Sequence, residues 1–225
     1  MSDFKVESES LDPLVVTRSW VYHLVIGMTN LATFLWPFPT RTSGREHIPK
    51  RQGALIVGNH ASWLDIPLVA KGAKGRHVCF VARHSLSNSR VLAFVMKSCG
   101  AVLIDPKSGD RKALKRVVEH LKAGDLVTMF AEGTRSKDGR LGTFKRGALM
   151  AARQARVQVI PCALLGTQRA WGRSMGTPRP ARLKVRFGPP VDPKDADALD
   201  QVRAWIAQEM VGTDQECLPG TTEEA

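Results

Sequence analysis

A histidine and an aspartate that could cooperate in proton transfer follow an apolar run. The run at 53–58 (GALIVG) has the composition of a buried strand, and His60 and Asp65 come soon after it. On one continuous helix, residues five apart point about 140° from each other. The two side chains can meet if His60 stands on the turn before a helix and Asp65 on its first turn. Asp65 would then orient the imidazole, and His60 would be a general base.

A purely structural role explains the same residues. Ser62 and Asp65 have a spacing close to that of a capping box, in which Ser62 caps the helix and Asp65 reaches back to a free N–H group. The two roles are compatible, and the sequence leaves both open.

A second group of residues, able to bind a phosphate, follows the strand expected at 126–131. The group consists of Glu132, Gly133, Thr134, Arg135, Ser136, Lys145 and Arg146. A glycine lets the backbone approach a ligand closely, and the arginine fork matches phosphate oxygens. The last two cations lie near the amino end of an expected helix, where anions are already favoured. Taken alone, the Glu-Gly-Thr-Arg run is also typical of a turn with a salt bridge.

The scaffold that must position these residues is predicted to be an α/β domain, because short runs rich in Val and Ile alternate with stretches of helical periodicity. We expect strands at 53–58, 77–82, 101–104, 126–131, 157–163 and 182–187. We expect helices at 63–72, 88–98, 110–122, 145–155 and 195–210. The predicted fold is a single domain over 41–211 with a central mixed sheet flanked by helices. An acidic tail at 1–13 and a polar tail at 212–225 flank the chain.

The segment 14–40 is predicted to be a hydrophobic, membrane-associating helix. The 22 residues between Arg18 and Arg41 include no Asp, Glu, Lys or Arg. A helix from Trp20 to Trp36 would be about 25 Å long, which is short of the ~30 Å hydrocarbon core. Such a helix can lie in the interface or dip into one leaflet, with its tryptophans at the headgroup level. The alternative is a helix packed on the soluble domain.

The charge of the chain points to an anionic partner. The net charge is +12, yet the region from Arg41 to Pro190 holds 29 Lys and Arg against 8 Asp and Glu. This basic body favours nucleic acid, a phospholipid surface or a phosphorylated small molecule as the partner. A hydrophobic fraction of 43% in 225 residues supports a core of ordinary size and excludes wholesale disorder.

The cysteines and the amino terminus indicate a reducing compartment. The four cysteines form no CxxC pair, and three of them lie in apolar runs. The first 13 residues are acidic and polar and lack the features of a secretory signal. We therefore expect the cytoplasmic face of a membrane, the inner membrane in a bacterium, with a monotopic or single-pass attachment.

Together the two groups of polar residues resemble sequence blocks of the glycerolipid acyltransferase family, typified by 1-acyl-sn-glycerol-3-phosphate acyltransferase. The family's first block is Asn-His, four residues and Asp, and Asn59, His60 and Asp65 match it. Its third block is Phe-Pro-Glu-Gly-Thr-Arg, and residues 130–135 match it with Ala131 in place of proline. The two blocks in combination are highly specific, whereas neither is so alone.

The resemblance extends over roughly residues 45–165 and includes one departure. The fourth block, an apolar strand with a proline, is matched by 159–161. The second block usually runs from glycine through apolar residues to Asp-Arg, but here Gly100 to Asp105 is followed by Pro106. Arg111 is the candidate to replace the missing arginine. The departure bears on the identity of the acceptor more than on the chemistry.

The resemblance implies direct attack of an acceptor hydroxyl on an acyl thioester, with acyl-CoA or acyl-carrier protein as the donor. His60 would take the hydroxyl proton, and Asp65 would hold the imidazole. The residues expected to bind the glycerol phosphate are Glu132, Gly133, Thr134, Arg135, Lys145, Arg146 and Arg111. No cofactor is expected, and no metal, because the other histidines show no ligand-like spacing with cysteines or carboxylates.

These features predict an O-acyltransferase that makes phosphatidic acid from 1-acyl-sn-glycerol 3-phosphate in phospholipid biosynthesis. The partners would be an anionic phospholipid membrane, a lysophospholipid acceptor and the acyl donor. The first alternative is acylation of another lysolipid, either a lyso-ornithine lipid or a lysophospholipid. A remote alternative is a non-catalytic basic protein that binds membrane or nucleic acid. Nucleic acid is disfavoured because aromatic residues are only 6% of the chain and provide no stacking platform.

Overall fold

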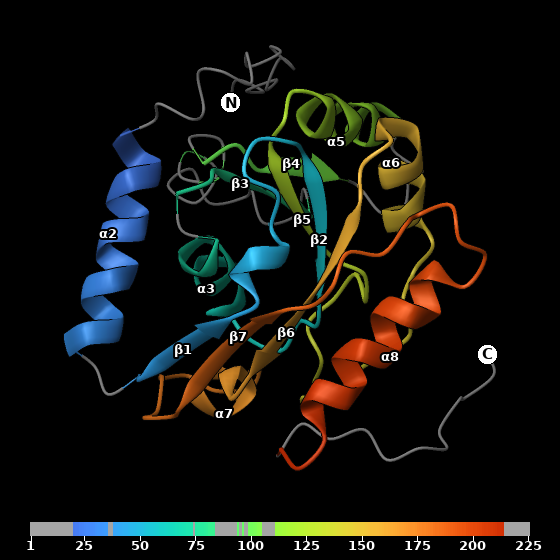
Figure 1. Cartoon of the computed structure of the whole chain (residues 1–225). Helices are drawn as coiled ribbons and strands as arrows, with labels where there is room; N and C mark the ends of the chain where they lie inside the picture. The colour runs from blue at the N-terminus through green and yellow to red at the C-terminus, as the bar shows by residue number, and fades with distance from the viewer. Residues whose placement is uncertain are drawn as a thin grey trace, which may run out of the picture.

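The structure is a computed structural model of the 225-residue chain, and it describes residues 20–35, 38–73, 75–83, 94, 96, 99–104 and 111–213 (Figure 1). Its strands are β1 (Thr40–Ser43), β2 (Ala54–Gly58), β3 (Val78–Arg83), β4 (Val102–Ile104), β5 (Leu126–Phe130), β6 (Val159–Leu165) and β7 (Leu183–Phe187). Its helices are α2 (Trp20–Leu35), the short 3₁₀ helix Arg45–His47, α3 (Asp65–Gly72), α5 (Arg111–Lys122), α6 (Gly147–Ala155), α7 (Thr167–Trp171) and α8 (Ala198–Met210).

The strands form one mixed sheet in the order β1-β7-β6-β2-β5-β3-β4. Neighbouring strands are parallel except for the antiparallel pair of β6 and β7. The residues of β2 are all buried between β5 and β6, as its apolar run predicts. Gly58 pairs with Phe130, so β2 and β5 end side by side. The polar residues that follow these two strands therefore meet at one edge of the sheet.

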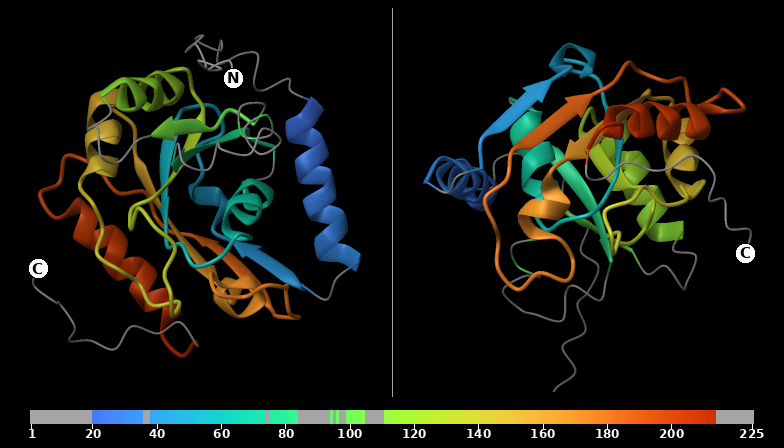
Figure 2. Two further views of the ribbon diagram at one scale, coloured as in Figure 1. Left: turned by 180° about the vertical axis from the view of Figure 1, so that it is seen from behind. Right: turned by 90° about the horizontal axis from the view of Figure 1, so that it is seen from below.

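Helices cover both faces of the sheet, which confirms the predicted single α/β domain (Figure 2). On one face lie α5, α6 and α8, and their core residues include Val117, Leu121 and Ile206. On the other face lies α3, which contributes Leu68 and Val69, with α2 packed outside it. The sheet is thus the middle layer, and its carboxyl edge is free to hold functional groups.

Most of the predicted elements agree with the structure to within two or three residues. The strand predicted at 157–163 occupies Val159–Leu165 instead, because its ladder with β7 continues to the pair of Leu165 with Lys184. Three elements were not predicted, namely the edge strand β1, the short 3₁₀ helix Arg45–His47 and the short helix α7. The helix expected at 88–98 and the tails at 1–13 and 212–225 lie largely or wholly outside the described residues, although Phe94 and Met96 are helical.

The hydrophobic segment forms α2, which has one buried and one exposed side. Val21 and Tyr22 are buried, and the Val78 N–H donates to the Tyr22 hydroxyl at 3.3 Å. The opposite side leaves four apolar side chains largely exposed, namely Trp20, Leu24, Met28 and Leu31. Within the described part of the chain, no helix has both the length and the apolar character to cross a bilayer.

Candidate active site

His60 and Asp65 meet at the carboxyl end of β2. Asp65 is the first residue of α3, and His60 stands on the turn before it. The His60 Nδ1 lies 2.8 Å from the Asp65 Oδ2, which confirms the geometry expected from their spacing. The aspartate side chain is fully buried, whereas the His60 side chain is 16% exposed. The buried carboxylate therefore holds a histidine that solvent or a substrate can still reach.

The same Asp65 oxygen also accepts two backbone hydrogen bonds. The N–H groups of Ala61 and Ser62 donate to the Asp65 Oδ2 at 2.7 Å each. The Ser62 Oγ accepts from the Leu64 N–H at 3.1 Å, as a capping residue does. The Asp65 carboxylate thus holds both the backbone of its own turn and the His60 ring. Because the carboxylate only accepts, we assign the imidazole proton to Nδ1, which leaves Nε2 of His60 as a proton acceptor.

Two neighbouring residues fix the His60 ring and the end of β2. The ring stacks on Phe130, the last residue of β5, with centroids 4.0 Å apart and planes 12° apart. The Asn59 side chain exchanges two hydrogen bonds with the Leu164 backbone, accepting from its N–H at 2.8 Å and donating to its carbonyl at 2.9 Å. Asn59 is therefore bound to β6 and has a structural role in positioning His60.

Glu132 joins the loop after β5 to the loop after β2. Its Oε1 accepts from the His60 N–H at 2.9 Å, and its Oε2 accepts from the Gly142 N–H at 3.3 Å. A second link runs from the Ser136 N–H to the His60 carbonyl at 2.7 Å. Burial raises the pKa of Glu132 to about 7. Both carboxylate oxygens face backbone donors, so the geometry gives Glu132 a positioning role beside His60.

Gly133 and Lys145 lie in contact next to this bridge. Gly133 adopts the left-handed conformation with φ of 71°, and its N–H donates to the Phe130 carbonyl at 2.9 Å. A Cβ at this position would lie 3.2 Å from the Lys145 Nζ. The Lys145 backbone N–H donates to the Ala131 carbonyl at 2.9 Å. The tight turn thus needs glycine, and it sets an ammonium group beside the loop.

Arg135 lies over the indole of Trp63. Its guanidinium carbon is 3.7 Å from the ring centroid, which is within the range of a cation–π interaction. The Arg135 Nη1 is buried and has no hydrogen-bond partner among the described residues. The Arg173 guanidinium donates to the Arg135 carbonyl at 3.3 Å. An arginine with an unused donor beside His60 is suited to bind an anion.

The other predicted site residues lie further out. Thr134 is exposed on the same loop, and Arg146 is exposed immediately before α6. Arg111 is the exposed first residue of α5, which follows the edge strand β4. The side chains of Arg111 and Arg146 make no hydrogen bond or ion pair with another described residue. The structure brings together His60, Asp65, Glu132, Gly133, Arg135 and Lys145, and it does not bring Arg111 into contact with them.

Two contributors were missed from the sequence. Trp63 stands between His60 and Asp65 in the chain, and an aromatic residue beside a predicted base was an available signal. Arg173 follows α7 and is 38 residues from Arg135, so no local pattern pointed to it. Within the described residues, the one group of three His, Cys or acidic side chains close enough to share an ion is at the opposite edge of the sheet.

Comparisons with known proteins identify the family of the chain. A family model described as Acyltransferase matches residues 40–165. The chain is 33% identical over 196 residues to the chloroplastic 1-acyl-sn-glycerol-3-phosphate acyltransferase LPAT1 of Arabidopsis thaliana, over 84% of this chain and 54% of that protein. It is also 33% identical over 208 residues to 1-acyl-sn-glycerol-3-phosphate acyltransferase alpha of Bos taurus, over 88% of this chain and 69% of that protein.

A solved structure has the same fold. The 1-acyl-sn-glycerophosphate acyltransferase PlsC of Thermotoga maritima superposes with a TM-score of 0.71 at 26% identity, over 84% of this chain and 76% of that chain. The present chain spans about half the length of the plant relative. The family match includes both loops that meet at His60. The chain therefore belongs to the acyltransferase family.

Proposed function

We propose that the protein transfers an acyl chain from an acyl thioester to the free hydroxyl of 1-acyl-sn-glycerol 3-phosphate, which gives phosphatidic acid. The observation that carries the proposal is the buried Asp65 carboxylate holding His60 Nδ1 at 2.8 Å, beside an arginine with an unused donor. The names of the relatives agree with this acceptor. The donor would be acyl-CoA or acyl-carrier protein, and no cofactor is required by this chemistry.

The reaction proceeds by direct attack. The His60 Nε2 takes the proton of the acceptor hydroxyl while the hydroxyl oxygen bonds to the thioester carbonyl carbon. The C–S bond then breaks, and the departing thiolate takes the proton back from the imidazolium. The Asp65 carboxylate stabilises that imidazolium, and base catalysis of this kind contributes about 10²–10⁴-fold.

Arg135 binds the acceptor phosphate, assisted by Lys145 and the Thr134 hydroxyl. Trp63 holds the guanidinium plane by the cation–π contact, which limits the orientations of the Arg135 side chain. Glu132 keeps the two loops in register through its backbone hydrogen bonds. Arg146 and Arg111 act at longer range by attracting anions to this edge of the sheet.

The protein works on an anionic membrane surface. Trp20, Leu24, Met28 and Leu31 recur at spacings of four, four and three, so they lie along one face of α2. An exposed apolar stripe on a basic protein suits the interface of an anionic bilayer, where the lysolipid and its product both reside. We place the protein on the cytoplasmic face as a peripheral or monotopic protein.

The test is an acceptor panel with the full chain. Labelled acyl thioester is incubated with 1-acyl-sn-glycerol 3-phosphate, other lysophospholipids and a lyso-ornithine lipid. Product from the first acceptor is expected. The departure at Asp105 and Pro106 favours another lysolipid as the second candidate, and product only from that lipid would replace the proposed acceptor. The absence of product with every acceptor and both donors would contradict the enzymatic proposal.

A substitution separates phosphate recognition from catalysis. Arg135→Ala should raise the KM for the lysophosphatidate about 10–100-fold with a smaller change in kcat, because charged hydrogen bonds to the phosphate are lost. The matched control is Arg140→Ala, since Arg140 is an exposed arginine of the same loop. An unchanged KM in Arg135→Ala would remove Arg135 from the phosphate site.

A further inference from the structure

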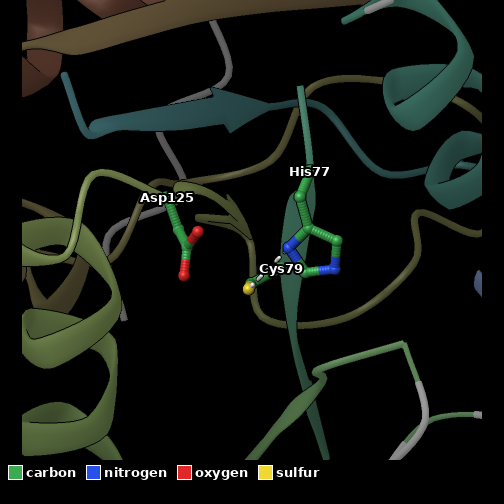
Figure 3. Close-up of side chains that lie close together, drawn as sticks. All are labelled: His77, Cys79 and Asp125. Carbon is green, nitrogen blue, oxygen red and sulfur yellow. Dashed lines mark hydrogen bonds between the residues drawn. The ribbon is translucent and has the colours of Figure 1, made fainter. Parts of the chain in front are cut away.

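A second cluster of reactive side chains consists of His77, Cys79 and Asp125, which lie close together (Figure 3). The cluster lies at the starts of β3 and β5, whereas His60 follows the carboxyl end of β2. His77 immediately precedes β3, Cys79 belongs to β3, and Asp125 immediately precedes β5. Val78 pairs with Leu126, so His77 and Asp125 extend the same ladder as neighbours across two strands. Residues two apart on a strand share a face, which places Cys79 on the side of His77. The ligand atoms of the three residues all lie within 4.8 Å of one another.

The spacing of the donor atoms suits a tetrahedral zinc ion. The Cys79 Sγ is 3.6 Å from the His77 Nδ1. Zinc bonds of about 2.3 Å to sulfur and about 2.0–2.1 Å to nitrogen, at tetrahedral angles, separate the two atoms by about 3.6 Å. Imidazole, thiolate and carboxylate are the ligand types of zinc, whereas magnesium and calcium prefer oxygen alone.

His120 orients the carboxylate of this cluster. The His120 Nδ1 lies 2.8 Å from the Asp125 Oδ2 and 3.5 Å from the Cys79 Sγ. The Asp125 backbone N–H also donates to the His120 carbonyl at 3.0 Å. A ligating carboxylate is commonly held by such a neighbour. His120 therefore fixes Asp125 and lies within 3.5 Å of the Cys79 sulfur.

The cluster borders a cavity through His77 and Asp125. His77 and Asp125 line a cavity of about 800 Å³ between α2, α3 and the starts of β3 and β5, which provides a path for an ion. The same cavity is lined by Arg76, whose guanidinium donates to carbonyls of the surrounding loops, including Gln52 at 3.1 Å. A thiolate and a carboxylate would neutralise a divalent ion here.

We propose that His77, Cys79 and Asp125 form a zinc site that cross-links the start of β3 to the start of β5. The site lies outside the proposed acyl-transfer centre and does not depend on that function. The sequence predicts no metal because the three residues have no recognisable ligand spacing. They become neighbours only through the pairing of β3 with β5.

The experiment uses the full chain after treatment with a chelator. Titration with zinc should show one equivalent bound, and the melting temperature should rise by about 5–10 °C at a free zinc concentration about 100-fold above Kd. Cobalt(II) should occupy the same position and give a thiolate-to-cobalt charge-transfer band in the near ultraviolet. Cys79→Ser should remove that band and the zinc-dependent rise in melting temperature.

A matched control is Cys162→Ser, since Cys162 is equally buried in the same sheet, on β6. Its band should match that of the unmodified chain. His77→Gln, at the end of the strand, is the second variant, and it serves as the test if Cys79→Ser does not fold. It should weaken zinc binding at least tenfold. A folded chain with no charge-transfer band, a band that survives in Cys79→Ser, or full zinc affinity in His77→Gln would each overturn the proposal.

Discussion

Two His–Asp pairs with identical spacing lie at opposite edges of the sheet. His60 and Asp65 follow β2, and His120 and Asp125 precede β5. Each pair has its residues five apart, and in each the Nδ1 to Oδ2 distance is 2.8 Å. Sequence spacing and side-chain geometry therefore do not distinguish the pair that we assign to catalysis from the pair that we assign to support of a metal site.

The backbone around each aspartate makes the difference. Asp65 begins α3, is fully buried, and accepts two backbone N–H groups at the positive end of the helix. Asp125 follows the last turn of α5 and is 13% exposed, and its carboxylate faces His120 and the Cys79 thiol. The Asp65 Oδ2 thus holds both its own turn and His60, while the Asp65 Oδ1 is buried without a hydrogen-bond partner among the described residues. The partly exposed Asp125 lines a cavity, where a ligand can reach it.

The largest expected effect comes from removing the two histidines in turn. His60→Ala should lower acyl transfer by about 10²–10⁴-fold because the base is lost. His120→Ala should leave kcat within about a factor of two and should lower the affinity for zinc. Initial rates with 1-acyl-sn-glycerol 3-phosphate, together with circular dichroism to verify folding, measure both. Equal losses of acyl transfer in the two variants would contradict the assignment of catalysis to His60 and of metal support to His120.

Substitution of the two aspartates should separate acyl transfer from zinc binding in the same way as substitution of the two histidines. Asp65→Asn should lower kcat by about 10²–10³-fold, because an amide oxygen can keep the backbone N–H contacts but carries no negative charge to stabilise the His60 imidazolium. Asp125→Asn should leave kcat unchanged and weaken zinc binding. Steady-state kinetics and a cobalt titration on both variants provide the comparison. Normal turnover in Asp65→Asn would show that His60 needs no carboxylate.

The parts of the fold that could be predicted are those fixed by local periodicity. The runs that form β2 and β5 are predominantly apolar, with Thr128 as the one polar residue of β5, and α5 carries its buried residues at helical spacing. The edge strand β1 has the sequence TRTS, with alternate residues exposed, and it exists because β7 pairs with it from more than 140 residues away. Such pairing leaves no trace in a short polar segment.

The candidate site likewise contains contacts that could be predicted from the sequence and contacts that could not. His60 and Asp65 could be paired from sequence because both belong to one strand-to-helix turn. The partner of Glu132 could not, because its carboxylate bonds to the His60 backbone 72 residues away. The His77, Cys79 and Asp125 cluster needs the order of β3 and β5 in the sheet, which no spacing in the chain reveals. Contacts between loops depend on sheet topology, and topology was the least predictable feature.

The free energy of unfolding should depend on pH through Glu132, whose carboxylate bonds to the His60 backbone. Its pKa is raised from 4.5 to about 7 by burial, so the folded chain binds its proton more tightly than the unfolded chain. The stability from this group is fully present below about pH 4.5 and is lost as the pH rises to about 7, by at most about 3 kcal/mol. Glu132→Gln removes this slope. Urea unfolding at pH 5 to 8 measures it.

Asp138, an exposed carboxyl, provides a control in which stability changes with pH in the opposite direction. Backbone hydrogen bonding from Arg140, with a further bond from Ser136, lowers the pKa of Asp138. Its contribution is therefore present at higher pH and is lost on acidification, and Asp138→Asn should remove a small effect in that direction. If Glu132→Gln and the unmodified chain lose stability in parallel between pH 5 and 7, Glu132 is not the titrating group.

The smallest effect concerns the residue that stands between histidine and aspartate in each pair. Trp63 lies three positions after His60 and supports Arg135, whereas Ala123 lies three positions after His120 and has no ring to offer. Trp63→Leu keeps an apolar side chain but removes the cation–π contact, which contributes about 0.5–2 kcal/mol. The KM for the lysophosphatidate should therefore rise about 2–30-fold with kcat nearly unchanged. Trp63→Phe should recover part of the loss, because a phenyl ring retains a weaker π face. Normal acceptor binding in Trp63→Leu, together with weakened binding in Arg135→Ala, would contradict this role of Trp63. Arg135 would then be positioned by its loop and its backbone contact with Arg173. The two pairs would differ only in their histidines and carboxylates.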